Sequence, residues 1–209
     1  MHLQISLFPL SKFLADFTPD CWETPSLVAQ KMAALIIKSD HRVMEPAAGT
    51  GQISQYLPSG SFCCQIKPNR LQSLKRIAPH CHAIQADFLY LGRDTPPLSE
   101  FSQLKQGFDV IITNPPFSLA IKFIEQGLKL LDNSNPNARL LYLLPIDFGC
   151  SIKRGTALQA LDCHVHHVYW ILDRIAYIRN GIPHEGRQCY DAVFELRPGK
   201  KASGATSYL

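Results

Sequence analysis

Residues 114–117 read Asn-Pro-Pro-Phe and directly follow the apolar run 109–113. The two prolines remove two backbone N–H donors and fix φ, so the Asn114 side chain and the Pro115 carbonyl are expected to be rigid acceptors at the end of a strand. Two such acceptors suit an amino group on a conjugated ring, because holding both of its hydrogens favours a pyramidal nitrogen that can attack a methyl group. Phe117 can stack on the ring. The pattern predicts Asn114, Pro115 and Phe117 as catalytic residues, and a purely structural Pro-Pro turn is the alternative.

A second segment, residues 45–51, reads Glu-Pro-Ala-Ala-Gly-Thr-Gly and follows an expected strand. Its small residues let a ligand approach the backbone closely. It lacks the G-x-G-x-x-G and P-loop patterns that bind nucleotide phosphates. Glu45 would repel a phosphate but attract the cationic amino and sulfonium groups of S-adenosylmethionine. The segment therefore predicts a loop that binds this cofactor, with a ligand-free turn as the alternative. The candidate cofactor-binding residues here are Glu45, Pro46, Ala47, Gly49 and Gly51.

Both segments need a scaffold that places them at one edge of a sheet. Short apolar runs alternate with amphipathic helical patterns, which is typical of βαβ units and a parallel sheet covered on both faces. Ser26 and Ser118 are expected to cap two of the helices. The expected strands are 41–44, 61–66, 82–85, 108–113, 139–144, 164–172 and 188–196, and the expected helices are 26–37 and 118–131. Irregular connections are expected at 92–97 and 179–187.

Length and composition exclude several classes of protein. The 209 residues, 46% hydrophobic and 18% charged, predict one globular domain over 1–197 with a flexible tail over 198–209. The apolar runs are shorter than the roughly 20 residues that a transmembrane helix needs, and the first residues lack the features of a secretory signal. Seven cysteines without a C-x-x-C pair favour a reduced, cytoplasmic location. The net charge of +4 does not identify a partner.

Together, segments 45–51 and 114–117 resemble the cofactor and catalytic motifs of class I S-adenosylmethionine-dependent methyltransferases, and within them the γ-ordered enzymes that methylate adenine N6 in DNA. The resemblance covers roughly residues 18–148 and continues more weakly to 196. It implies a Rossmann-like α/β fold with three layers, α/β/α, and a seven-stranded, mostly parallel sheet whose last strand is antiparallel. In the γ-ordered enzymes, a segment similar to 23–25 (Glu-Thr-Pro) closes over the methionine part of the cofactor. The resemblance therefore implies that Thr24 donates to the cofactor carboxylate, with a simple Thr-Pro helix entry as the alternative.

The resemblance implies further contacts with the cofactor. Gln65 stands where these enzymes carry an acidic residue for the ribose hydroxyls, and an amide provides a weaker, uncharged bond there. Ile66 is expected to pack on the adenine ring. Asp87 is expected to accept from the adenine amino group, with a capping role as the alternative, and Phe88 to lie beside the ring. Asn114 and Pro116 are expected to border the same site.

Residues 172–177 resemble a late motif whose loop lines the pocket for the target base. Tyr177 is therefore a candidate to stack on the base, and Arg174 a candidate to bind substrate. Three further residues, Arg179, His184 and Arg187, can meet phosphates or form a solvated basic loop. His164 and His166 share a strand face but lack the additional ligands of a metal site. No metal site is therefore expected.

The function implied is transfer of a methyl group from S-adenosylmethionine to adenine N6, in DNA rather than RNA, with the base flipped out of a duplex. RNA adenine and a protein glutamine amide are the alternatives, although the glutamine-specific family usually carries Tyr after Pro-Pro. A non-catalytic binding subunit is the third. The γ-ordered enzymes continue into a recognition domain, so either recognition is slight or a separate specificity subunit supplies it.

Overall fold

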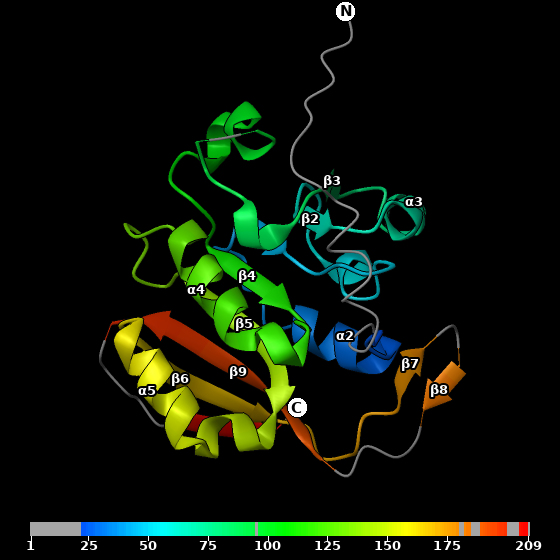
Figure 1. Ribbon diagram of the computed structural model, residues 1–209. Helices are drawn as coiled ribbons and strands as arrows, with labels where there is room; N and C mark the ends of the chain where they lie inside the picture. The colour runs from blue at the N-terminus through cyan, green and yellow to red at the C-terminus, as the bar shows by residue number, and fades with distance from the viewer. Residues whose placement is uncertain (1–21, 95, 180–181, 185–188, 200–204, 209) are drawn as a thin grey trace, which may run out of the picture.

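The computed structural model describes residues 22–94, 96–179, 182–184, 189–199 and, in backbone only, 205–208. Its centre is an eight-stranded sheet with the order β10-β6-β9-β5-β4-β1-β2-β3 (Figure 1). β9 runs antiparallel to both of its neighbours, and the other strand pairs are parallel. The strands are β1 (Val43–Glu45), β2 (Phe62–Gln65), β3 (His82–Gln85), β4 (Val110–Thr113), β5 (Arg139–Pro145), β6 (Cys163–Trp170), β9 (Asp191–Pro198) and β10 (Ala205–Tyr208).

Helices cover both faces of the sheet. α4 (Ala120–Leu130) and α5 (Ile152–Ala160) pack on one face, and α2 (Ser26–Ala33) and α3 (Pro68–Ile77) pack on the other. Successive residues of β5 alternate between the two apolar cores, as the pleat of a strand requires. Short 3₁₀ turns connect these elements: η1 (Ser54–Tyr56), η2 (Phe88–Tyr90), η3 (Leu98–Glu100), η4 (Ser102–Leu104), η5 (Phe117–Leu119) and η6 (Ile146–Cys150). The expected α/β/α layers and the mostly parallel sheet are confirmed.

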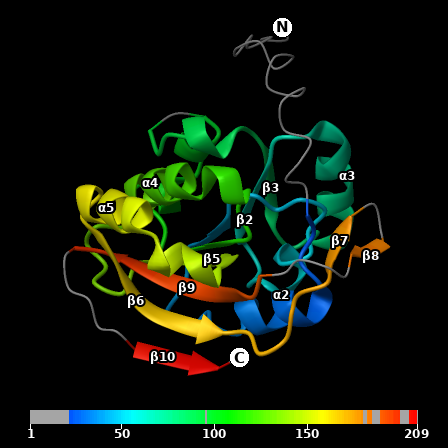
Figure 2. The same ribbon diagram turned by 60° about the horizontal axis from the view of Figure 1, so that its bottom comes forward.

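The structure also differs from the sequence prediction. The expected tail contains β10, which pairs in parallel with β6 at the sheet edge (Figure 2). The segment 179–187 was expected to be irregular, but β7 (Tyr177–Arg179) and β8 (Ile182–His184) form an antiparallel hairpin there. α3 and α5 were not predicted because each has a single buried residue, Leu74 and Leu158, so neither has a broad buried apolar stripe.

Both predicted serine caps are wrong. Pro25 occupies the N-cap of α2, while the Ser26 hydroxyl is hydrogen-bonded to Tyr56 Oη at 2.5 Å. Leu119 precedes α4, because Ser118 lies inside the η5 turn. Neither helix has a side-chain cap, so each is held by the packing of its buried face.

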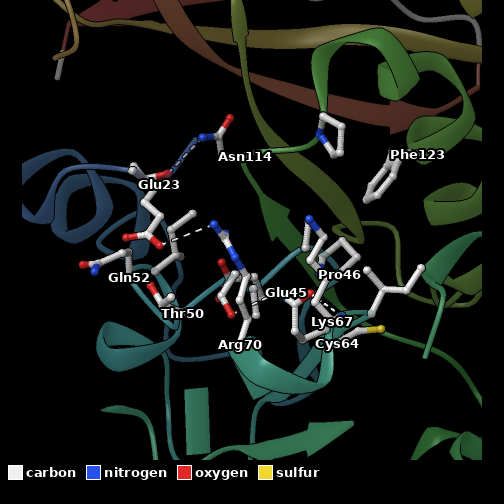
Figure 3. A pocket seen from close by; sticks show the side chains of 18 of the residues that line it. Glu23, Glu45, Pro46, Thr50, Gln52, Cys64, Lys67, Arg70, Asn114 and Phe123 are labelled. Carbon is white, nitrogen blue, oxygen red and sulfur yellow. Dashed lines mark hydrogen bonds and ion pairs between the residues drawn. The ribbon is translucent and has the colours of Figure 1, made fainter. Parts of the chain in front are cut away.

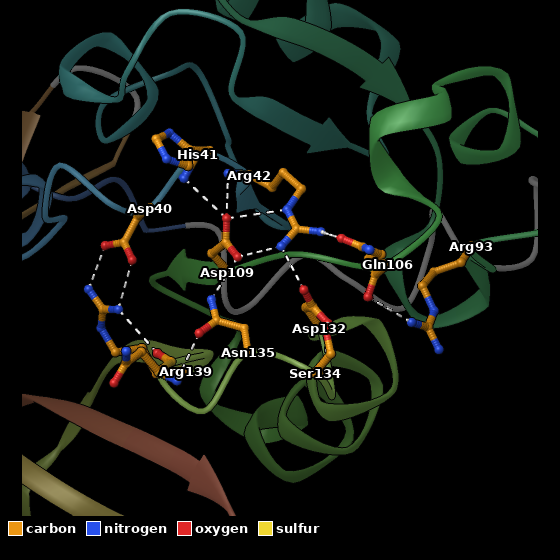
Figure 4. A network of polar contacts seen from close by, with 11 residues as sticks. Asp40, His41, Arg42, Arg93, Gln106, Asp109, Asp132, Ser134, Asn135 and Arg139 are labelled. Carbon is orange, nitrogen blue, oxygen red and sulfur yellow. Dashed lines mark hydrogen bonds and ion pairs between the residues drawn. The ribbon is translucent and has the colours of Figure 1, made fainter.

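The amino ends of β1, β4 and β5 are tied together by charged side chains (Figure 4). Arg42 binds Asp109 and Asp132 at 2.6 and 2.7 Å. Arg139 binds Asp40 through two nitrogens at 3.0 and 2.7 Å, and both side chains are buried. This network lies at the edge opposite the strand ends that carry Glu45, Gln65 and Asn114. Within the described residues, no helix is both long and apolar enough to cross a bilayer.

Candidate active site

A pocket lies at the carboxyl ends of the parallel strands β1, β2, β3 and β4, as expected for an α/β sheet of this kind (Figure 3). We call it the larger pocket. Most of the predicted cofactor-binding residues line it: Thr24, Glu45, Pro46, Ala47, Gly49, Gln65, Ile66, Asp87, Asn114 and Pro116. Residues far apart in sequence are therefore brought to one cavity, as their positions at strand ends predict.

Two predicted cofactor contacts are not part of this lining. Phe88 is buried beneath the pocket, where its ring packs on Phe123 with 5.0 Å between the ring centroids, and Phe123 and Leu89 line the cavity instead. Gly51 has φ +103°, and a Cβ there would lie 3.2 Å from Leu74 of α3. Gly51 therefore serves a tight turn against the helix, while Gly49, with φ +58°, faces the pocket.

Glu45 is the most deeply buried acid of the larger pocket, with 1% of its surface exposed. Burial raises its pKa from 4.5 to about 8, against the opposing effect of the Ser54 hydroxyl, which donates to the carboxyl group. At neutral pH the side chain is thus largely protonated until a cation approaches. Glu45 can therefore act as a counter-charge that forms when a cationic ligand enters.

Gln65 connects the two loops that border the pocket. Its Nε2 donates to the Gly49 carbonyl at 3.0 Å, and its Oε1 accepts from the Lys67 backbone N–H at 2.9 Å. A carboxylate has no hydrogen to give the Gly49 carbonyl, so the amide suits this position in a way an acid does not. This hydrogen bond gives a structural reason for an amide at position 65, where similar enzymes carry an acidic residue. Contact of Gln65 with a ribose stays a prediction.

Asp87 has the capping role that was the alternative for it, and it also lines the larger pocket. Its Oδ1 accepts the Leu89 N–H at 3.0 Å and so caps the η2 turn. Burial raises the pKa of this carboxyl, and the bond from Leu89 opposes the rise. The predicted contact with an adenine amino group is compatible with the cap.

Asn114 is oriented by Thr24, which lies 90 residues earlier in the sequence. Its Nδ2 donates to the Thr24 hydroxyl oxygen at 3.1 Å, and Thr24 is buried. This bond fixes which end of the amide faces Thr24, and leaves Oδ1 as the acceptor presented elsewhere (Figure 3). Because a hydroxyl that accepts one bond still has a hydrogen, Thr24 can also donate to a cofactor carboxylate as predicted.

A smaller pocket adjoins the larger one and is lined by Trp22, Asn114, Pro115 and Phe117. It contains the three predicted catalytic residues. The Phe117 ring is held edge-on by Tyr177, with 6.3 Å between the ring centroids. Tyr177 itself is only 1% exposed, so its predicted role as a stacking residue is wrong: it supports Phe117 from the core.

Trp22, which the sequence analysis did not single out, lines both pockets. The guanidinium of Arg179 lies 5.3 Å from the centre of its ring, and His184 meets the ring edge-on at 5.3 Å. These two residues come from the β7–β8 hairpin. The signal in the sequence was an aromatic residue directly before Glu-Thr-Pro, but an isolated aromatic residue does not reveal which cavity it faces.

The remaining predicted substrate residues lie outside the two pockets. Arg174 is exposed and sits 5.3 Å from the centre of the Tyr190 ring. Arg187 lies outside the described residues. His164 binds the Gly199 carbonyl at 2.7 Å, and within the part of the chain that is described, no three His, Cys, Asp or Glu residues gather as metal ligands.

Comparison with known proteins bears on this geometry. No protein-family model matches the chain, and no curated protein matches its sequence. Solved structures do match. A candidate RNA methyltransferase from Pyrococcus horikoshii is 14% identical, with a TM-score of 0.64 over 86% of this chain and 88% of that one. The chain has the class I methyltransferase fold.

Two further structures with this fold illustrate its range of substrates. The methyltransferase subunit of a type I restriction-modification system from Streptococcus thermophilus is 17% identical, with a TM-score of 0.62 over 90% of this chain and 47% of the subunit. The tRNA m1G37 methyltransferase of M. jannaschii is 17% identical, with a TM-score of 0.56 over 85% of this chain and 51% of that enzyme. At these identities the likeness establishes the methyltransferase fold and leaves the substrate open.

Proposed function

We propose that the protein is an S-adenosylmethionine-dependent methyltransferase that acts on the N6 amine of adenine in DNA. The observation that supports this best is the orientation of Asn114. Its Nδ2 is bound to Thr24, so its Oδ1 is the end of the amide left for a substrate amino group. Pro115 and Phe117 lie in the same small pocket, which adjoins the larger one.

The larger pocket fits the cofactor by its chemistry. Gly49 and the alanines of the loop leave the backbone accessible, apolar residues such as Phe123 can cover a purine ring, and Glu45 is a buried acid that can neutralise a cation. When bound, S-adenosylmethionine supplies an electrophilic methyl group. The residues expected to hold it are Thr24 and Glu45 at its amino-acid end and Gln65, Ile66 and Asp87 around its nucleoside.

The residues of the smaller pocket would act on the substrate. Asn114 Oδ1 and the Pro115 carbonyl accept the two hydrogens of the adenine amino group, which localises the nitrogen lone pair for attack. Phe117 stacks on the base, and its ring is supported by Tyr177. Trp22 borders the same pocket and gives the base a second aromatic neighbour. In a duplex, the base must be flipped out to reach these groups.

We favour DNA over the other acceptors because the Glu-Thr-Pro segment resembles that of the γ-ordered DNA enzymes, and Thr24 of this segment accepts a hydrogen bond from Asn114. Phe117 replaces the tyrosine that is usual in glutamine-specific enzymes. The non-catalytic alternative would draw support from Gln65, which stands where similar enzymes carry an acid, but the bonds of this amide to Gly49 and Lys67 give it a structural role that is independent of catalysis. A separate specificity subunit remains part of the proposal.

The test is transfer of a labelled methyl group from S-adenosylmethionine to duplex DNA, single-stranded DNA, RNA and protein, followed by identification of the product. N6-methyladenine in DNA is expected from the wild type and a loss of at least a hundredfold from Asn114→Ala, since an oriented acceptor of this kind contributes about 3 kcal/mol to the barrier. The matched control is Asn133→Ala, an exposed asparagine away from both pockets. Label that survives Asn114→Ala, or label in RNA or glutamine instead of DNA, would contradict the proposal.

A further inference from the structure

An ion pair between Glu23 and Arg70 extends over the larger pocket. Glu23 Oε1 and Arg70 Nη2 are 3.8 Å apart, and both side chains line the cavity. Figure 3 shows the Arg70 side chain pointing across the pocket towards Glu23. Both groups are partly shielded, with 21% of the Arg70 side chain and 14% of the Glu23 side chain exposed.

The two charges are held by different parts of the fold. The Glu23 backbone is fixed to the β7–β8 hairpin, because its N–H donates to the Ile178 carbonyl at 2.8 Å and its carbonyl accepts the Ile178 N–H at 3.0 Å. Arg70 comes from the first turn of α3. A Cβ built on Gly49 would lie 3.7 Å from Arg70 Nη1, so the guanidinium rests over the glycine of the 45–51 loop. The pair therefore lies where this loop, the hairpin and α3 meet.

The pair is easily separated. Its nitrogen–oxygen distance of 3.8 Å exceeds that of a hydrogen bond, so the two groups attract each other by charge alone. Such loose, partly exposed pairs contribute little to stability. Since both side chains line the cavity, a ligand there that offers one partner to each charge can displace the contact at low cost.

We infer that Glu23 and Arg70 recognise the amino-acid end of S-adenosylmethionine, with Arg70 binding the carboxylate and Glu23 the ammonium group. This rests on the cofactor of the proposed function, though not on its nucleic-acid substrate. The amino-acid end is itself a pair of opposite charges, so exchange of partners leaves no charge unpaired in the pocket. Arg70 presents a planar guanidinium that matches a carboxylate in two bonds. Glu45 lies deeper in the pocket and already accepts the Ser54 hydroxyl, so it can supply a charge near the cation, while Glu23 is the acid that meets the ammonium group directly.

The test compares two ligands that share a nucleoside thioether and differ in the amino-acid end. S-adenosylhomocysteine carries that end, and 5′-methylthioadenosine lacks it. Calorimetric titration without nucleic acid is expected to show that Arg70→Met lowers the affinity for S-adenosylhomocysteine about tenfold to a hundredfold. The affinity for 5′-methylthioadenosine should change less than threefold. Arg70→Lys keeps the charge and should retain part of the preference for S-adenosylhomocysteine over 5′-methylthioadenosine. Glu23→Gln should lower the affinity for S-adenosylhomocysteine and leave the affinity for 5′-methylthioadenosine unchanged.

The matched control is Arg76→Met, which removes an exposed arginine from the last turn of the same helix and should change neither affinity. Equal weakening of both ligands by Arg70→Met would overturn the inference, because it would indicate a structural role for Arg70. No weakening of either ligand, or no binding of S-adenosylhomocysteine to the wild type, would overturn it as well. If the wild type binds as described but methylates no DNA, the proposed substrate is wrong and the inference stands.

Discussion

At the scale of single residues, Glu45 carries the most informative chemistry. Its pKa of about 8 in the folded protein, against 4.5 ordinarily, reflects burial of the carboxyl group. A cationic ligand placed beside it favours the ionised form and so lowers the pKa. Cofactor binding near neutral pH should therefore release a proton from Glu45, and affinity should rise as the pH approaches 8.

The substitution Glu45→Gln tests this coupling with little change of shape. Between pH 4.5 and 8 the folded wild type keeps a proton that the unfolded chain has lost, so its free energy of unfolding falls as the pH rises through this window. Glu45→Gln should lack that decline, be more stable than the wild type above pH 8, and yet bind S-adenosylhomocysteine more weakly. Thermal melts from pH 5 to 9 and calorimetry in buffers of different ionisation enthalpy measure the two effects. Equal proton release by both proteins would refute the role of Glu45.

The aromatic residues show where prediction from sequence stops at this scale. Asn114, Pro115 and Phe117 line one pocket, as expected of a short motif that directly follows a strand, and their catalytic role stays a prediction. Tyr177 and Phe88 were also expected at the site, but both are buried behind it. An aromatic side chain next to a motif can line a cavity or support its wall, and only the packing of distant elements decides between the two.

At the scale of elements, the positions of the other strands along the chain and their mostly parallel direction followed from hydrophobic patterning and the resemblance. β10 and the β7–β8 hairpin were not predicted. Both contain residues whose pattern resembles that of a loop, and each is stabilised by backbone bonds to a distant segment, β6 in one case and Glu23 in the other. Propensity alone cannot reveal such pairing, because the deciding partner is remote in sequence.

Gln65 provides a prediction at this scale, because it joins the 45–51 loop to the turn that precedes α3. Gln65→Glu introduces the acid usual in similar enzymes, but the carboxylate cannot donate to the Gly49 carbonyl and is repelled by it. The substitution should lower the free energy of unfolding by about 1–3 kcal/mol, measured by urea denaturation at pH 7. Gln85→Glu, at an exposed position at the end of β3, is the control and should change stability little. An increase in stability for Gln65→Glu would show that the two loops are not connected through this amide.

At the scale of the whole molecule, the two ends of the parallel strands have different roles, one in forming the pockets and the other in stabilising the fold. The carboxyl ends of the strands form the pockets, and the amino ends carry the network of Arg42, Asp109 and Asp132 (Figure 4). Burial alone would raise the pKa of Asp132, but hydrogen bonds from Ser134 and Arg42 outweigh it and hold the pKa at about 2. This stabilisation is present above the ordinary value of 3.8 and is lost as the pH falls towards 2. The amino edge thus keeps its charges paired across the pH range in which Glu45 titrates.

The pair of Asp40 and Arg139 tests this separation of tasks. Their side chains are 2% and 5% exposed, and Asp40 accepts two bonds from the guanidinium, so Asp40→Asn leaves a buried positive charge without its counter-ion. The substitution should cost about 3–5 kcal/mol of folding free energy. Because the pair lies at the amino edge, the remaining folded protein should bind S-adenosylhomocysteine within twofold of the wild type at a temperature well below its melting point. Urea denaturation and calorimetry of the same variant measure both quantities. A large loss of affinity in fully folded Asp40→Asn would mean that the two edges are energetically coupled through the strands, since no side chain of the network reaches the pockets.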